Sequence, residues 1–82
     1  MKILKFYSDT CGPCKVMSEN LAKAEIPCTE IDVYDENNEG LIEKYDITGI
    51  PTLVILDDRD EVVEKFTGIT SIDAIKGVLC NL

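Results

Sequence analysis

Hydrophobic and polar residues follow two different spacings along this chain, and these spacings predict its secondary structure. Short runs of strand-forming residues, bounded by turn residues, predict strands at residues 3–7, 29–34, 52–56 and 61–66. Residues 35–40 are polar and are expected to form a loop. Apolar residues at helical spacing predict three helices: one from Pro13 that ends before Pro27, a short one carrying Leu41, Ile42 and Tyr45, and a last one carrying Ile72, Ile75, Val78 and Leu79.

The resulting order, β-α-β-α-β-β-α, predicts an α/β fold with a four-stranded mixed sheet and helices on both faces. Two strands joined by a helix pair in parallel through a right-handed crossover, so the first two strands should be parallel. The unbroken apolar run at 52–56 predicts a central strand, and the polar turn at 57–60 makes the last two strands an antiparallel hairpin. Thr70 is the expected N-cap of the last helix, with Asp73 at its third position.

Length and charge narrow the function classes. The 82 residues allow a single domain, expected to span residues 1–82. Eight basic and 16 acidic residues give a net charge of −8, which argues against binding to nucleic acid or to an anionic membrane. The longest apolar run is far shorter than the roughly 20 residues of a membrane span, and the first residues do not resemble a signal peptide. We therefore expect a cytoplasmic protein.

The clearest chemical signal is the C-x-x-C pair formed by Cys11 and Cys14, where the first strand gives way to a helix. In a βαβ unit, this arrangement is typical of a redox dithiol. Unpaired N–H groups and the positive end of the helix dipole favour a thiolate at Cys11, so Cys11 is predicted to attack a target disulfide. Cys14 is predicted to resolve the mixed disulfide by attacking Cys11. Gly12 and Pro13 bring the two sulfurs together within one turn, which Pro13 stiffens.

Three motifs along the chain resemble those of thioredoxins and occur in the same order. They are Cys11-Gly12-Pro13-Cys14-Lys15, Gly49-Ile50-Pro51-Thr52 before an apolar strand, and Gly68 before the last helix. The resemblance covers residues 3–82, so the chain looks like a short, minimal thioredoxin of about glutaredoxin size, without the family's first strand and helix.

The resemblance implies further site residues. Pro51 matches the cis-proline that faces the dithiol, which leaves the Ile50 backbone free to pair with a bound peptide. Gly68 and Ile69 match the apolar rim on which substrates rest. Lys5 stands where the family usually has a buried aspartate that assists proton transfer to the resolving thiol. A protonated lysine there would favour thiolate by charge attraction, and an ordinary solvent-reaching lysine is the alternative.

The resemblance also implies a function and partners. We expect a thiol–disulfide oxidoreductase that carries electrons to protein disulfides, acts as a monomer and binds no cofactor itself. Its donor would be a thioredoxin-reductase-like flavoprotein, and ribonucleotide reductase is a plausible target. Two alternatives stay open: a glutathione-dependent, glutaredoxin-like reductase, and a non-catalytic binding module. Residues 68–71 lack the paired glycines of glutaredoxins, and the net charge of −8 would repel anionic glutathione.

Cys28 and Cys80 stand apart from the pair. Both helices that precede them are expected to run away from the dithiol, so both cysteines should lie at the opposite end of the domain. They are expected either to fill the core or to form a second disulfide. Because the chain has no histidine and its cysteines are split between two ends, we expect no metal site. The acidic turn near Asp57 is expected to be solvated.

Overall fold

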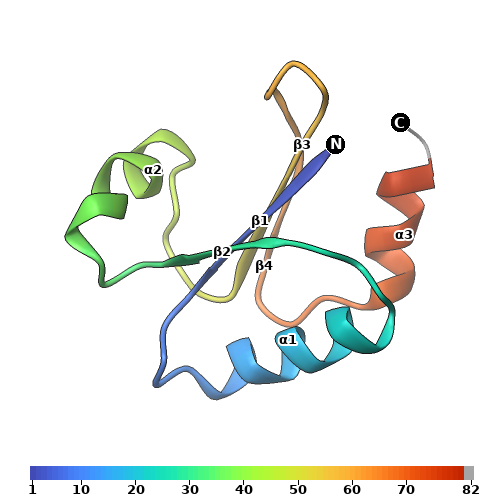
Figure 1. Ribbon diagram of the computed structural model, residues 1–82, viewed down its shortest axis with the longest axis horizontal. Coiled ribbons are helices and arrows are strands. Elements are labelled where there is room, and N and C mark those ends of the chain that lie inside the picture. The colour runs from blue at the N-terminus through green and yellow to red at the C-terminus, as the bar shows by residue number, and fades with distance from the viewer. Residues whose placement is uncertain (81–82) are drawn as a thin grey trace.

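The computed structural model describes residues 1–80, and its elements follow the predicted order (Figure 1). The strands are β1 (Lys2–Tyr7), β2 (Thr29–Asp32), β3 (Thr52–Leu56) and β4 (Val62–Thr67). The α-helices are α1 (Gly12–Lys23), α2 (Glu39–Lys44) and α3 (Ile72–Cys80), and a single 3-10 turn, η1 (Glu36–Asn38), precedes α2. The predicted α/β fold class is therefore confirmed. Residues 81 and 82, which the expected domain includes, lie outside the described residues.

The strands form one mixed sheet in the order β2-β1-β3-β4. β1 and β2 are parallel, with Lys5 beside Glu30, as the right-handed crossover requires. β3 lies antiparallel to both β1 and β4. All five residues of β3 are buried, which confirms that the apolar run forms a central strand.

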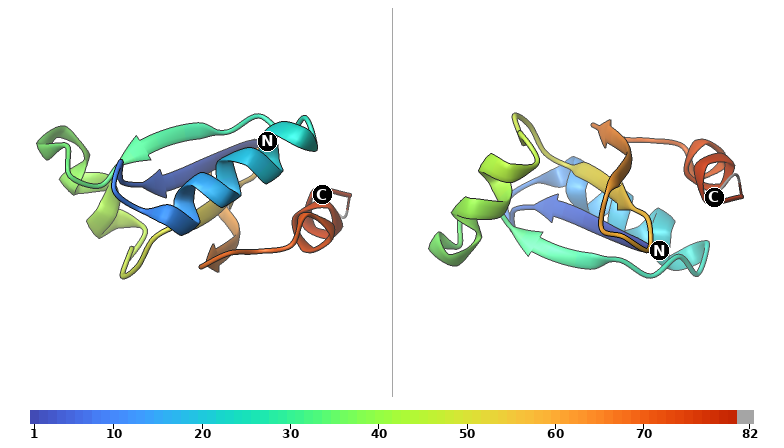
Figure 2. Two further views of the ribbon diagram at one scale, coloured as in Figure 1. Left: turned by 90° about the horizontal axis from the view of Figure 1, so that it is seen from below. Right: turned by 90° about the horizontal axis from the view of Figure 1, so that it is seen from above.

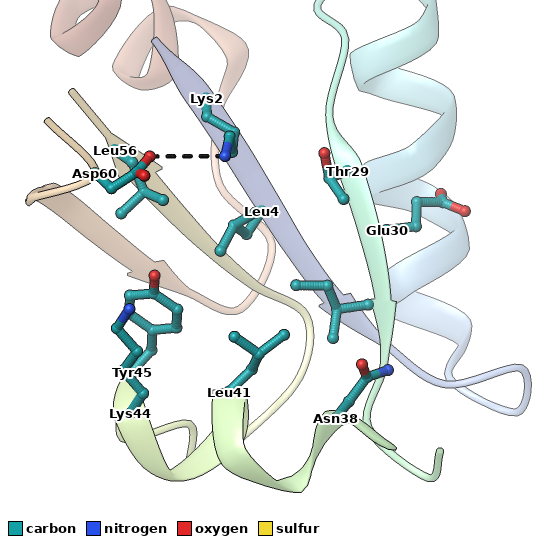
Figure 3. Close-up of a pocket in the computed structure, with 11 residues that line it drawn as sticks. Lys2, Leu4, Thr29, Glu30, Asn38, Leu41, Lys44, Tyr45, Leu56 and Asp60 are labelled. Carbon is teal, nitrogen blue, oxygen red and sulfur yellow. Dashed lines mark ion pairs between the residues drawn. The ribbon is translucent and has the colours of Figure 1, made fainter. Parts of the chain in front are cut away.

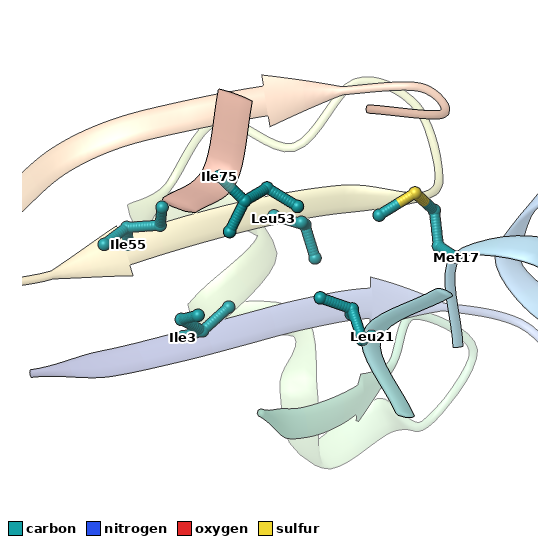
Figure 4. Close-up of a cluster of buried hydrophobic side chains, with 6 residues drawn as sticks. All are labelled: Ile3, Met17, Leu21, Leu53, Ile55 and Ile75. Atoms are coloured by element: carbon teal, nitrogen blue, oxygen red, sulfur yellow. The ribbon is translucent and has the colours of Figure 1, made fainter. Parts of the chain in front are cut away.

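Successive residues of β1 and β3 point to opposite faces of the sheet and divide the core into two clusters. On one face, α1 and α3 cover a cluster of Ile3, Met17, Leu21, Leu53, Ile55 and Ile75 (Figure 4). On the other face, α2 helps to cover a cluster of Leu4, Phe6, Ile31, Tyr45, Val54 and Leu56. Helices therefore lie on both sides of the sheet, as Figure 2 shows from two directions.

Side chains that bond to the backbone set the strand ends where the apolar pattern alone places them wrongly. The predicted second strand runs to residue 34, but β2 ends at Asp32, whose carboxylate accepts the Tyr34 N–H at 2.9 Å and turns the chain. The last strand, β4, begins at Val62, one residue later than predicted. The Asp57 carboxylate accepts the N–H groups of Arg59 and Glu61 at 2.8 and 3.0 Å and holds Glu61 in the turn.

The N-cap of α3 is Ser71, so the prediction of Thr70 is wrong by one residue. Ser71 Oγ accepts the Ala74 N–H at 3.2 Å, in the geometry of an N-cap. Thr70 is used in the preceding turn, where its hydroxyl donates to the Gly68 carbonyl at 3.1 Å. Its N–H donates to Met17 Sδ at 3.3 Å, which joins this turn to α1.

Within residues 1–80, no helix has the length and apolar character needed to cross a membrane.

Candidate active site

The dithiol lies at the junction of β1 and α1. After β1 ends at Tyr7, the chain turns, and the Cys11 N–H donates to the Ser8 carbonyl at 3.2 Å. Cys11 has extended backbone dihedral angles and is the N-cap of α1, and the proline of the first turn starts the helix. Cys11 and Cys14 form a disulfide, with their Cα atoms 5.2 Å apart. The two sulfurs that the sequence pairs are therefore joined in the structure.

The two cysteines differ in exposure. Cys14 is buried, with 2% of its surface exposed, whereas Cys11 is partly exposed and Gly12 and Pro13 are exposed beside it. A target disulfide can therefore reach the Cys11 sulfur, while Cys14 can react only with Cys11 Sγ once Cys11 has bound the target. This asymmetry suits a nucleophile and a resolving thiol.

The surroundings of Cys11 favour negative charge on its sulfur. Cys11 Sγ accepts the Cys14 N–H at 3.1 Å, one of the N–H groups that a helix start leaves without a helical partner. The first turn of α1 carries no acidic residue that would oppose a thiolate. The amide and the positive end of the helix dipole therefore both stabilise the anion.

The two other predicted parts of the site, residues 50–51 and residues 68–69, lie beside each other at the same end of the sheet. The Ile50–Pro51 peptide bond is cis, and Pro51 is buried. The Gly68 N–H donates to the Pro51 carbonyl at 2.8 Å, so the two segments are joined directly. Gly68 has a φ of 90°, a left-handed conformation that favours glycine, and the next residue, Ile69, is 58% exposed.

The strand register places these segments at the dithiol end. Phe6, near the end of β1, pairs with Thr52 at the start of β3, and Thr52 pairs with Thr67 at the end of β4. The chain before Thr52 and the chain after Thr67 therefore lie at the end of the sheet from which β1 continues to Cys11, along the lower part of Figure 1.

Lys5 is buried beneath this end of the sheet, so the alternative of a solvent-reaching lysine is wrong. Only 1% of its surface is exposed. Its Nζ donates to Ser18 Oγ, lies 3.4 Å from Glu30 Oε1, and sits 5.0 Å from the centre of the Tyr7 ring. Neither Ser18 nor Glu30 was predicted from the sequence as a site residue. The parallel pairing of β1 with β2 is the signal that could have found Glu30.

Lys5 and Cys14 line the same cavity, of about 150 Å³, whose other lining residues are Tyr7, Ser8, Asp9, Lys15, Ser18 and Glu30. The pKa of Tyr7 is raised, first by burial and then by the carboxylates of Asp32, Asp9 and Glu30. Its phenol therefore stays neutral at physiological pH, and the charges in the cavity come from lysines and carboxylates.

Cys28 and Cys80 are both free, so the alternative of a second disulfide is wrong. Cys28 is partly buried against the cluster under α1 and α3, as expected for a core-filling side chain, whereas Cys80 is exposed. Burial and, after it, Glu30 raise the pKa of the Cys28 thiol, while Lys5 lowers it. No group of three or more potential metal ligands is found among residues 1–80.

A larger hollow, of about 420 Å³, lies on the α2 face of the sheet (Figure 3). Leu4, Leu41 and Tyr45 line it, together with residues of both charges, and Lys2 Nζ lies 3.6 Å from Asp60 Oδ1 at one side. Lys2 begins β1, at the opposite end of that strand from Cys11, and none of the predicted site residues lines this hollow. Thiol chemistry is therefore expected at the smaller cavity, which Cys14 and Lys5 line.

Comparisons with known proteins agree with this geometry. The thioredoxin family model matches residues 1–80. A protein disulfide-isomerase of Zea mays is 34% identical over 82 residues, which cover 89% of this chain and 16% of that protein. The mitochondrial thioredoxin of Bos taurus is 28% identical over 86 residues, which cover 98% of this chain and 50% of that protein. The chain thus spans half or less of the length of these curated relatives.

Solved structures of thioredoxins superpose on most of the chain. A mutant thioredoxin from Halobacterium salinarum has a TM-score of 0.81 and 31% identity, covering 96% of this chain and 71% of that one. Thioredoxin 1 from Thermosipho africanus has a TM-score of 0.76 and 26% identity, covering 99% of this chain and 92% of that one. With the joined dithiol and the family match over residues 1–80, this chain belongs to the thioredoxin family of thiol–disulfide oxidoreductases.

Proposed function

We propose that this chain is a thioredoxin-like electron carrier that reduces protein disulfides through Cys11 and Cys14. One observation carries the proposal: a partly exposed Cys11 at the N-terminus of α1 is bonded to a Cys14 that is only 2% exposed. This is the arrangement that dithiol–disulfide exchange requires, since one sulfur must meet the target and the other must wait behind it.

The reaction proceeds in two exchanges. In the reduced protein, the Cys11 thiolate attacks one sulfur of the target disulfide, and the other target sulfur leaves as a thiolate. Cys14 then loses its proton and attacks Cys11 Sγ, which forms the Cys11–Cys14 disulfide and releases the second target thiolate. The dithiol gives up two electrons and the target disulfide gains them, so the balance is complete without a bound cofactor.

The neighbouring segments would orient the target. The backbone of Ile50 offers a strand-like edge next to Pro51, and an extended target segment would pair with it. Gly68 lies against Pro51, and Ile69 exposes an apolar side chain on which the target would rest. A segment held in this way would present its disulfide to Cys11.

A reductase must return the carrier to its dithiol form. We propose a thioredoxin-reductase-like flavoprotein as this donor, with disulfide-containing proteins, such as ribonucleotide reductase, as targets. A solved structure of this fold, thioredoxin f2 with ferredoxin:thioredoxin reductase, is in keeping with a reductase donor. We further propose that the chain is a cytoplasmic monomer that contributes to redox homeostasis.

The test is reduction of insulin disulfides, followed as turbidity, with electrons supplied either by NADPH and thioredoxin reductase or by glutathione and glutathione reductase. We expect turnover with the first system and none with Cys11→Ser, while Cys80→Ser, which changes an exposed cysteine outside the dithiol, retains full activity. Turnover with the glutathione system alone would instead support the glutaredoxin-like alternative. If Cys11→Ser leaves the cellular role intact, the chain acts as a binding module and the proposal is wrong.

A further inference from the structure

Among residues 1–80, which the structure describes, Lys5 is the only charged residue that is buried. An ammonium loses its hydration when it is buried, so it requires a compensating partner. The described contacts provide two: Ser18 Oγ on α1 and Glu30 Oε1 on β2, the latter at 3.4 Å. Its charge is thus held in place by partners on α1 and β2.

The described partners of Lys5 leave one N–H group of its ammonium without a hydrogen bond, and they do not fully screen its positive charge from the cavity. An ammonium has three N–H donors, and the hydrogen bonds described within residues 1–80 use two of them. Lys5 is 1% exposed, whereas the Glu30 side chain is 51% exposed and is therefore partly screened by water. The positive charge accordingly acts more strongly on the interior of the cavity than the negative charge does.

The dithiol residue that shares this cavity with the Lys5 charge is Cys14. Cys14 lines the cavity with Lys5, whereas Cys11 does not. The other titratable groups that line the cavity are Tyr7 of β1, Asp9 of the loop that follows, Lys15 of α1 and Glu30 of β2. Lys15 is exposed and Tyr7 is neutral, so Lys5 is the buried cation of this set.

We propose that Lys5 is a positioning residue for the resolving step, in which its ammonium stabilises the Cys14 thiolate. The inference rests on the proposed dithiol exchange and assigns a group to its second half. While the target is bound to Cys11, the Cys14 thiol releases its proton to solvent through the polar cavity. The thiolate formed opposite Lys5 then attacks Cys11 Sγ, the bond between Cys11 and the target sulfur breaks, and the target leaves as a thiolate. Glu30 and Ser18 act through Lys5, since they hold its ammonium in position.

The two members of the ion pair must then have opposite effects. With Lys5→Met, the Glu30 carboxylate remains near Cys14 and the thiolate becomes less favourable. With Glu30→Gln, the ammonium is left without its counter-charge and the thiolate becomes more favourable. Lys5→Arg keeps the charge and should restore most of the wild-type behaviour. Lys2→Met is the matched control, because it removes a lysine from the same strand at an exposed position far from the dithiol.

The experiment follows reduced protein in a stopped-flow mixer with excess dithiobis(nitrobenzoate), an aromatic disulfide that releases a coloured thiolate at each exchange. The parent protein carries Cys28→Ala and Cys80→Ser, so only the dithiol reacts. The fast first release reports attack by Cys11, and the second release reports resolution by Cys14. The rate of each phase is measured between pH 5 and 10, a range chosen to span the ordinary pKa of a thiol, about 8.5.

We expect Lys5→Met to move the midpoint of the second phase upward by about one pH unit, which slows resolution about tenfold at neutral pH. Glu30→Gln should move the midpoint downward, and Lys2→Met should leave it unchanged. The first phase should be preserved in every variant, and a cooperative urea unfolding transition shows that each variant is folded.

An unchanged midpoint in Lys5→Met, or shifts of the same sign in Lys5→Met and Glu30→Gln, would overturn the role of Lys5. Two coloured thiolates per molecule with an unshifted midpoint would still support dithiol exchange. The loss of the second release in the parent protein would instead reject the proposed function itself.

Discussion

The ion pair of the buried Lys5 with the half-exposed Glu30 leads to a specific prediction for stability. Replacing a buried charge by an apolar side chain of similar volume removes the cost of desolvating that charge, and such changes are often neutral or stabilising. Lys5 is 1% exposed, while Ser18 and Glu30 can both turn to water after Lys5→Met because neither is fully buried. We therefore expect Lys5→Met to leave the free energy of unfolding within about 1 kcal/mol of wild type, or to raise it.

Glu30→Gln should act in the opposite direction. The ammonium remains 1% exposed and keeps an acceptor oxygen, but it loses its counter-charge, and we expect this loss to cost about 1–3 kcal/mol. Each kcal/mol corresponds to about 4–8 °C in Tm for a domain of this size. In the double variant there is no ammonium left to satisfy, so its stability should return to that of Lys5→Met.

Urea unfolding of oxidised wild type, both single variants and the double variant measures these differences as a double-mutant cycle. Lys2→Met is again the control, since the Lys2–Asp60 pair is exposed on both sides and is worth little. A loss of more than about 2 kcal/mol in Lys5→Met would contradict this expectation, because the buried charge would then be a stabilising element of the fold.

Three further predictions address the fold. Ser71→Ala should lower the free energy of unfolding by about 1 kcal/mol because the N-cap of α3 is lost, and a smaller loss than in Thr70→Ala would contradict the assignment of the cap. Leu53→Ala, in the central strand β3, should cost about 2–5 kcal/mol in urea unfolding, and a cost below about 1 kcal/mol would contradict its burial at 1% exposure. Cys28 has a raised pKa in the fold, so its contribution to stability is present below the ordinary thiol value and is lost as the pH rises through the raised value. Thermal unfolding across this alkaline range should therefore show a steeper loss of stability in wild type than in Cys28→Ala, and parallel curves would contradict the shift.

The parts of the fold that the sequence predicted are those set by local pattern. Four short apolar runs and three helical stripes specified the strands and helices, and the chirality of the βαβ unit then specified the parallel pair. The end of β2 and the cap of α3 were misplaced because each depends on which side chain reaches a backbone N–H. Asp32 turns the chain early, and Ser71 rather than Thr70 bonds into the helix.

In the candidate site, too, local features could be predicted and features that depend on tertiary packing could not. The dithiol could be identified because its spacing and its place before a helix are both local features. The burial of Lys5 could not be predicted from local features. Its partners lie 13 and 25 residues further along the chain and meet it only once α1 and β2 are packed. The exposure of Cys80 likewise depends on the rotation of α3 on the sheet, which the helical stripe alone leaves open.

The most direct test of an activated Cys11 with a buried partner compares the reactivity of the two thiols in the reduced protein. Reduced protein is treated briefly with iodoacetamide at neutral pH, and the labelled cysteine is identified by mass spectrometry of its peptides. We expect Cys11 to be labelled faster than free N-acetylcysteine, and Cys14 to be labelled much more slowly than Cys11. Labelling of Cys14 first, or of Cys11 no faster than the free thiol, would contradict an activated sulfur at the start of α1 with its partner buried behind it.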